Sequence, residues 1–171
     1  METQRRGLKV MMNTTTRYMI KSDLVDVTDI ARRAGALGWV EADFLRHARM
    51  RDVVMYVSVR GGRILGFMSI RLRSKEVEIL NMAVHPDFQR HRVGTQMVEH
   101  VLKKLHPGRR NVVLTSVPER DLSTQLFLKR NGFLATSTNR GDYGVDDSYV
   151  FERGITPGVR VEPDNVVVAY G

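Results

Sequence analysis

Residues 77–105 read VEILNMAVHPDFQRHRVGTQMVEHVLKKL and contain three successive patterns. An apolar run from Glu76 to His85 stops at Pro86-Asp87, which predicts a strand that ends in a turn. A basic loop follows. From Val93 to Leu105 apolar residues recur every three or four positions, which predicts an amphipathic helix. Its expected buried face consists of Val93, Met97, Val98, Val101, Leu102 and Leu105.

The basic loop immediately precedes the N-terminus of this predicted helix. The first amides of a helix have no intrahelical acceptor and carry the positive end of the helix dipole, so they favour an anion. Arg90, His91 and Arg92 add cationic side chains, and Gly94 allows close approach of the backbone. The segment therefore predicts a pyrophosphate site. A solvated turn is the alternative that the loop by itself leaves open.

The flanking sequence alternates strand and helix patterns. We expect strands at residues 17–20, 53–59, 64–72, 111–117, 133–137 and 147–153, with helices from Asp23, at 40–50 and at 122–130. The helix from Asp23 is expected to have Leu24, Val27, Ile30 and Ala31 on one face. Gly61-Gly62 predicts a hairpin. We expect residues 1–16 to form a flexible leader, residues 17–153 the folded domain, and residues 154–171 a C-terminal tail or an added edge strand.

Composition limits the class of protein. A chain of 171 residues with 42% hydrophobic residues fits one soluble domain. The net charge of +8 favours anionic partners, but the arginines are scattered without interleaved aromatic residues, so we do not expect nucleic acid as the partner. The chain contains no cysteine, and its five histidines show no ligand spacing, so we expect no metal. We also expect no membrane segment and a cytoplasmic location.

With the segment Leu122 to Phe133, which closes on Asn131-Gly132-Phe133, this order of elements resembles the GNAT superfamily of N-acetyltransferases. Within it, the sequence is most similar to the ribosomal-protein-alanine N-acetyltransferase (RimI-like) branch. The resemblance covers residues 17–153. It implies an α/β (α+β) fold with a mixed, mostly antiparallel central sheet that is splayed between the fourth and fifth strands, and with helices on both faces.

The resemblance also implies acetyl-CoA as co-substrate, without a metal. Its pantetheine would pair with the backbone of the fourth strand, and its pyrophosphate would bind loop amides. The family's loop pattern falls on residues 89–94, with Arg92 at a glycine position. The implied cofactor-binding residues are Met82, Ala83, Val84, Gln89, Arg90, His91, Arg92, Val93, Gly94, Thr95 and Asp121.

The catalytic positions of the RimI-like branch carry other residues here. Ser116 stands at the position of the general base, and Leu128 at that of the tyrosine acid. Glu78 matches the base of the histone acetyltransferase branch. Alternation along the strand predicts that Glu78 shares a face with Glu76, Leu80 and Met82, so a solvent-facing charge is the alternative. His85 is interpreted as a turn or cap residue, and Tyr143 and Tyr149 are candidate acids.

The sequence thus predicts an N-acetyltransferase that acts on a primary amine, foremost a protein N-terminus, by direct attack in a ternary complex. A lysine or small-amine acetyltransferase remains an alternative, as does a catalytically weak acyl-CoA-binding or interaction module. The expected partners are acetyl-CoA and a peptide or protein amine, and a homodimer is left open. The basic surface favours an acidic N-terminal peptide as the acceptor.

Overall fold

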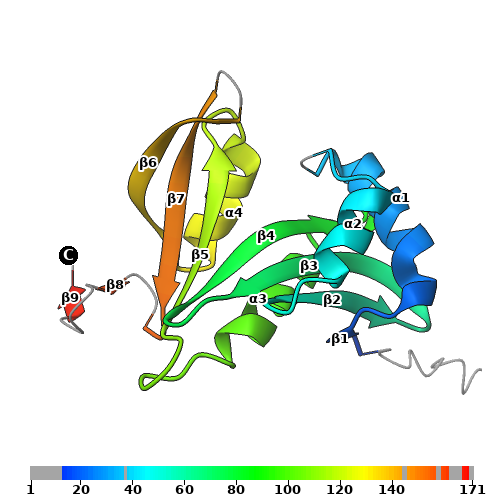
Figure 1. Ribbon diagram of the computed structural model, residues 1–171, viewed down its shortest axis with the longest axis horizontal. Helices are drawn as coiled ribbons and strands as arrows, with labels where there is room; N and C mark the ends of the chain where they lie inside the picture. The colour runs from blue at the N-terminus through cyan, green and yellow to red at the C-terminus, as the bar shows by residue number, and fades with distance from the viewer. Residues whose placement is uncertain (1–12, 37, 144–145, 157–158, 162–166, 170–171) are drawn as a thin grey trace, which may run out of the picture.

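The computed structural model of the protein describes residues 13–36, 38–143, 146–156, 159–161 and 167–169. Seven strands form one sheet in the order β1-β2-β3-β4-β5-β7-β6 (Figure 1). Neighbouring strands are antiparallel except for β4 and β5, which are parallel. The predicted mixed, mostly antiparallel sheet is confirmed. The bounds are β1 Thr15–Tyr18, β2 Val53–Arg60, β3 Arg63–Leu72, β4 Glu76–Val84, β5 Val112–Pro118, β6 Leu134–Tyr143 and β7 Asp146–Gly154.

Helices cover both faces of the sheet, as the resemblance implied (Figure 1). They are α1 Leu24–Ala34, α2 Glu41–Ala48, α3 Val93–Leu102 and α4 Leu122–Arg130, with short 3₁₀ turns η1 Lys21–Asp23 and η2 Pro86–Phe88. On one face, α1 and α2 contribute to a cluster with Phe67 and Ala83. On the other, α3 and α4 contribute to a cluster with Ile79 and Phe151. Each fully buried large apolar side chain stabilises the fold by about 1.5–3 kcal/mol.

The helix faces follow the apolar periodicity of the sequence. All four apolar residues predicted on one side of α1 are buried: Leu24, Val27, Ile30 and Ala31. On α3 the four residues Val93, Met97, Val98 and Val101 are buried, and Leu102 and Leu105 pack against the same cluster. Because an apolar stripe is stable only against another apolar surface, the stripe of each helix determines which side meets the sheet.

A β-bulge in β4 changes the prediction for the face of Glu78. Ser69 of β3 lies opposite Asn81 and Ile70 lies opposite Ile79, so Leu80 is an extra residue without a partner position in β3. The extra residue reverses the alternation, and Glu78 lies on the same face as Asn81. The prediction that Glu78 shares a face with Met82 is wrong, because simple alternation assumes an unbroken ladder.

The ends of the domain also differ from the expected bounds. Thr15 and Thr16 pair with Val59 and Ser58, so the first strand begins inside the expected leader. Near the C-terminus, β8 Val159–Val161 pairs with β9 Val167–Ala169 in a separate two-stranded sheet. An added edge strand of the main sheet is therefore wrong for this segment. The expectation of a flexible leader at residues 1–12 lies outside the described residues. Among the helices that the structure describes, none is long and apolar enough to span a lipid bilayer.

Candidate active site

The strands β4 and β5 part after a short parallel contact. Pairing is limited to Glu76, Val77 and Glu78 against Val112, Val113 and Leu114, and the two strands then diverge (Figure 1). At the point of divergence the buried hydroxyl of Thr115 donates a hydrogen bond to the Ile79 carbonyl at 3.1 Å. A side chain thus replaces the next rung of the ladder, and the sheet opens beyond it.

Backbone groups of β4 face this opening. The His85 amide donates to the Leu65 carbonyl of the β3 side, and backbone groups of successive strand residues alternate in direction. Ala83 therefore directs its amide and carbonyl towards β3, while Met82 and Val84 direct theirs towards the opening. Of the three residues expected to pair with a ligand, Met82 and Val84 have the suitable direction.

The N-terminus of α3 lies beyond the end of β4. The first hydrogen bond around this terminus joins the Gln96 amide to the Arg92 carbonyl at 2.9 Å. The amides of Val93, Gly94 and Thr95 precede it and have no acceptor in the described part of the chain, where no side chain caps the helix either. Three free amides at the positive end of the helix dipole favour the binding of an anion.

The loop before α3 contains two residues with left-handed backbone. Arg90 and Arg92 both have φ of 63°, in the region that glycine adopts most readily. The Arg92 side chain is 75% exposed, and its Nη2 lies 3.8 Å from Oε1 of Glu99. The family pattern has a glycine at the Arg92 position, and the left-handed backbone at this position explains that preference. Arginine adopts the same backbone conformation at a cost in conformational free energy.

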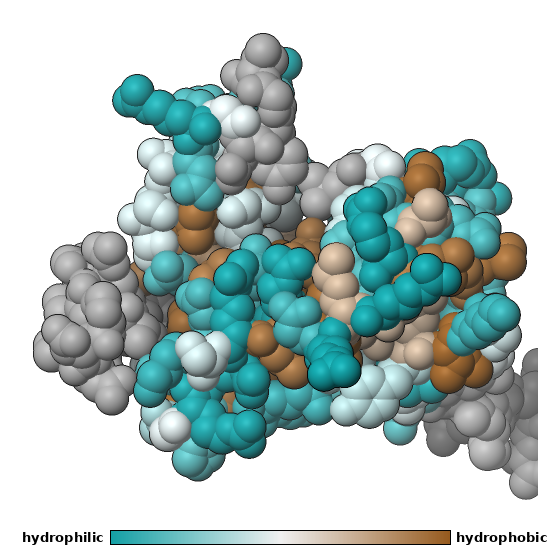
Figure 2. Space-filling view, viewed as in Figure 1, coloured by the Kyte–Doolittle hydropathy of each residue, from teal (hydrophilic) through white to brown (hydrophobic). Residues whose placement is uncertain are grey.

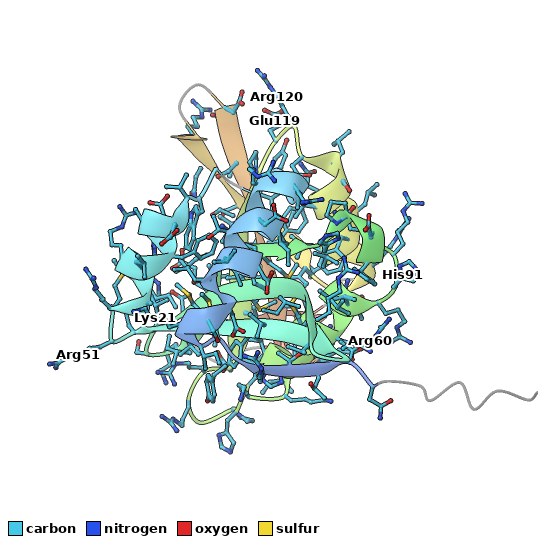
Figure 3. All side chains as sticks on the ribbon, turned by 90° about the vertical axis from the view of Figure 1, so that its right-hand side faces the viewer. Lys21, Arg51, Arg60, His91, Glu119 and Arg120 are labelled. Atoms are coloured by element: carbon cyan, nitrogen blue, oxygen red, sulfur yellow. The ribbon has the colours of Figure 1, made fainter. Side chains whose placement is uncertain are left out.

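Hydrogen bonds hold this loop in place, and one of them joins it to β4. Nε2 of Gln89 donates to the Val84 carbonyl at 3.2 Å, and Nδ1 of His91 lies 2.9 Å from the Gln89 carbonyl. In Figure 3 His91 lies at the outer edge of the molecule. Nδ1 of His85 accepts from the Asp87 amide at 3.2 Å, which is the cap role expected for it.

Gly94 has a packing role that the loop pattern did not reveal. A Cβ at this position would lie 3.2 Å from Cε2 and Cζ of Phe127 and 3.6 Å from Cγ2 of Val84. The missing side chain therefore lets α3 approach α4 and the end of β4. This close approach brings the free amides of α3 next to the opening.

Asp121 and Leu128 have structural contacts on α4. Asp121 is the N-cap, and its Oδ1 accepts from the Thr124 amide at 3.0 Å. Leu128, at the position of the family's tyrosine acid, is buried in the cluster beneath α3 and α4. A leucine has no proton to donate, so an acid has to come from another position.

Glu78 and Ser116 lie on the same face of the sheet. Val113 and Val117 of β5 belong to the cluster beneath α3 and α4. Because side chains alternate along a strand, Ser116 points to the other side of the sheet, towards α1 and α2, as does Glu78. Oε2 of Glu78 accepts from Nε and Nη2 of Arg73 at 3.0 and 2.8 Å. The carboxylate is held by an arginine, and its hydrogen bonds raise the pKa of Arg73.

Tyr149 is the tyrosine that the structure places near these positions. Its ring packs against the cluster that contains Leu128, and its hydroxyl donates to Oε1 of Glu119 at 3.4 Å. Glu119 lies at the end of the molecule where β5 passes into α4 (Figure 3). Sequence reasoning missed Glu119, because its partner is 30 residues away in the chain. The side chain of Tyr143 lies outside the described residues.

Metal ligands are not grouped in this region. Within the described ranges, no three His, Asp or Glu side chains come close enough to bind one ion. The polar groups described above for this region are backbone amides, an arginine-bound carboxylate and a tyrosine hydroxyl.

Known proteins are similar to this chain in sequence and in fold. A family model for the acetyltransferase (GNAT) domain matches residues 51–134, which extend from the start of β2 through α4. The ribosomal protein bS18-alanine N-acetyltransferase of Escherichia coli strain K12 is 24% identical over 136 residues, covering 80% of this chain and 90% of the relative.

Solved structures agree in fold. The crystal structure of the ribosomal-protein-S18-alanine N-acetyltransferase from Escherichia coli has a TM-score of 0.74 at 22% identity, covering 84% of this chain and 95% of that one. NAA60 of Arabidopsis thaliana in complex with acetyl-CoA has a TM-score of 0.72 at 19% identity, covering 84% and 99%. Residues 51–134 therefore belong to a GNAT acetyltransferase domain, and the chain is an acetyl-CoA-dependent N-acyltransferase.

Proposed function

We propose that the protein transfers the acetyl group of acetyl-CoA to the N-terminal amine of a protein or peptide, by direct attack in a ternary complex. The observation that carries this proposal is the opening between β4 and β5 beside three free amides of α3. The similarity to a ribosomal protein bS18-alanine N-acetyltransferase supports an N-terminal acceptor. The cytoplasm is the proposed location.

The direction of the backbone groups suggests how acetyl-CoA lies. Its pyrophosphate would accept hydrogen bonds from Val93, Gly94 and Thr95 at the start of α3. Its pantetheine arm would run along β4 and pair with Met82 and Val84, as an added strand does. This path leads from the loop towards the bulge at Leu80.

The bulge supplies a donor for the reacting carbonyl. When the amine attacks the thioester carbonyl, negative charge develops on its oxygen, and a fixed backbone amide stabilises that charge. An extra residue in a bulge is left outside the ladder, so the amide of Leu80 is our candidate donor. The C–S bond then breaks, the amine loses a proton, and the thiolate gains one.

Proton transfer requires a base and an acid. Glu78 is the proposed base, because its side chain lies on the same face as Asn81, three residues before it, and is only 25% exposed. Ser116 is the second candidate near the base position, although a serine hydroxyl needs a partner to act as a base. Tyr149 is the proposed acid, because it lies on the same side of the sheet as Leu128.

The proposal is tested by turnover with a panel of acceptors. Purified protein is incubated with acetyl-CoA and peptides with free N-termini, peptides with acetylated N-termini and an internal lysine, and small amines. We expect thiol release with the free N-termini, fastest for acidic peptides because of the +8 net charge. The proposal would be refuted if acetyl-CoA gave no thermal stabilisation and no acceptor gave thiol release.

The role of Glu78 has a matched control in the same strand. Glu78→Gln removes the base and should lower kcat by about 100-fold or more, while the affinity for acetyl-CoA is unchanged. Glu76→Gln removes a neighbouring carboxylate that also approaches Arg73, at 3.8 Å, and should retain activity. Equal activity of the two variants would remove Glu78 from the mechanism.

A catalytically weak acyl-CoA-binding module is the second candidate function. It is favoured by one specific observation: the base and acid positions of the RimI-like branch carry Ser116 and the buried Leu128. The same acceptor panel distinguishes the two functions. Tight acetyl-CoA binding without transfer to any acceptor would establish the module.

A further inference from the structure

Asn81 is a buried polar residue beside the opening that the proposed mechanism does not use. Only 3% of the residue is exposed, and it directly follows the bulged residue Leu80. Its Nδ2 has no hydrogen-bond acceptor among the described residues. A buried amide donor without a partner is costly to the folded state, and such a group in a native protein calls for an explanation.

The bulge determines where Asn81 points. With the extra residue in β4, Asn81 lies on the face that also carries Glu78 and Ser116. It follows the last rung between β4 and β5, which joins Glu78 to Leu114. Asn81 and Ser116 therefore flank the opening on one face, just beyond the point where the strands part.

In the proposed function the acyl donor uses the amides of α3, which lies with α4 on the opposite face, so the acceptor is placed on the face of Asn81. Glu78, Asn81 and Ser116 lie on this face beside the opening, and Ser69 of β3 lies directly opposite Asn81. Of the two buried donors without a partner in the described part of the chain, Asn81 lies on the strand that borders the opening, and Ser69 lies one strand away from it.

The unused donor requires an acceptor atom on the substrate. In a peptide with a free N-terminus, the Cα that bears the reacting amine is bonded directly to a carbonyl carbon, whose oxygen can accept a hydrogen bond. A lysine side chain or a simple alkylamine has none at that distance. The geometry points to Asn81 as a specificity residue: Nδ2 donates to the first carbonyl of the acceptor and so selects an α-amine of a peptide over other primary amines. This inference rests on the proposed function.

Paired acceptors test the inference directly. Alanine amide carries the carbonyl next to the amine, and isopropylamine has the same branched carbon without it. Wild-type kcat/KM should favour alanine amide, and Asn81→Leu should lower kcat/KM for alanine amide by about 10- to 100-fold, mainly through KM, while leaving isopropylamine unchanged. An equal loss for both acceptors would overturn the inference and assign Asn81 to the thioester carbonyl.

Stability measurements separate selectivity from folding. Asn81→Leu replaces a buried donor with an apolar side chain of similar size, so the thermal midpoint should stay level or rise while selectivity falls. The matched control is Ser69→Ala on β3, directly opposite Asn81, because its buried hydroxyl also lacks a partner in the part of the chain that the structure describes. Ser69→Ala should retain the wild-type preference for alanine amide. A loss of preference equal to that of Asn81→Leu would overturn the inference.

Different outcomes would refute the proposed function and the role of Asn81. If the wild-type protein acetylates no acceptor, the proposed function is wrong. If it acetylates both acceptors and Asn81→Leu leaves their ratio unchanged, the function stands and the role of Asn81 is wrong.

Discussion

At the scale of single residues, Arg92 combines a functional position with an unfavourable backbone. It has φ of 63° and ψ of 9°, and it is the N-cap of α3. A non-glycine residue in this region costs about 1–2 kcal/mol relative to right-handed backbone. The exposed contact with Glu99 offsets little of this cost, because surface ion pairs contribute about 0–1 kcal/mol.

Arg92→Gly should therefore stabilise the protein. We expect the free energy of unfolding in urea to rise by about 0.5–1 kcal/mol, since the greater freedom of glycine in the unfolded chain cancels part of the gain. Arg92→Ala is the control, because it removes the same charge and keeps the Cβ. A similar stability of both variants would show that the guanidinium matters more than the backbone strain.

Asp23 is the second residue with a specific prediction. Its side chain is 7% exposed, and its two carboxylate oxygens accept from Arg17 at 2.7 and 2.9 Å. The Arg17 hydrogen bond, with help from the Ile20 amide, lowers the pKa of Asp23 from its ordinary 3.8. A carboxyl group whose pKa is lowered by folding stabilises the protein above its unfolded pKa and loses that contribution as pH falls.

Asp23→Asn should cost about 1–2 kcal/mol of unfolding free energy at pH 7, towards the lower value because the Arg17 side chain is 42% exposed. Below about pH 4 the difference between variant and wild type should shrink, because the wild-type carboxylate becomes protonated. Urea unfolding at several pH values checks this. Asp43→Asn, at an exposed pair with Arg46, should show a smaller effect. A difference that is independent of pH would contradict the electrostatic explanation.

At the scale of elements, two glycines allow α3 to pack closely against its neighbours. Gly94 lies against Phe127 of α4, and Gly66 of β3 lies under Met97. A Cβ at Gly66 would lie 2.8 Å from the Ala83 carbonyl oxygen and 3.1 Å from Cε of Met97. Both contacts allow the helix to lie close to the sheet, and this closeness positions its N-terminal amides at the end of β4.

Gly66→Ala should be the more harmful of two matched substitutions. Its Cβ meets backbone, which cannot rotate away, so we expect a loss of about 1–3 kcal/mol and weaker acetyl-CoA binding. Gly94→Ala meets the edge of the Phe127 ring at 3.2 Å, and the helix preference of alanine offsets part of the strain. Unfolding curves and acetyl-CoA titrations measure both variants. A greater loss for Gly94→Ala would contradict this ranking.

At the scale of the whole molecule, the sheet consists of two parts that share a short parallel contact. One part contains β1 to β4 with α1 and α2, and the other contains β5, β6 and β7 with α4 (Figure 1). Figure 2 shows hydrophobic atoms where the two parts meet on this face, with hydrophilic atoms around them. A ligand that lies in the opening contacts both parts and so stabilises their relative position.

Acetyl-CoA should therefore raise the thermal midpoint of the whole domain. At 100 times its dissociation constant, a ligand that binds only the folded state adds about 2.7 kcal/mol. A short acetyl thioester of N-acetylcysteamine, which lacks the phosphates, should stabilise far less, because it cannot reach the amides of α3. Equal stabilisation by both compounds at equal concentration would place the binding energy away from the α3 terminus.

Local patterns in the sequence were sufficient for much of the fold. The apolar stripes of α1 and α3, the bounds of α4 and the hairpin at Gly61-Gly62 are confirmed, because each depends on residues close together in the chain. The free amides at the start of α3 have the same origin, since a helix terminus exposes its amides wherever the helix begins.

Other features were decided only by tertiary structure. The bulge at Leu80 exists relative to β3, so no pattern within β4 predicts it, and it determines which face Glu78 and Asn81 share. The contact of Glu119 with Tyr149 joins residues that are far apart in the chain. Periodicity within one segment determines what that segment buries, whereas the register between segments determines which polar groups meet. The basic loop and helix were therefore readable from residues 77–105, and the surroundings of the reacting amine required the folded sheet.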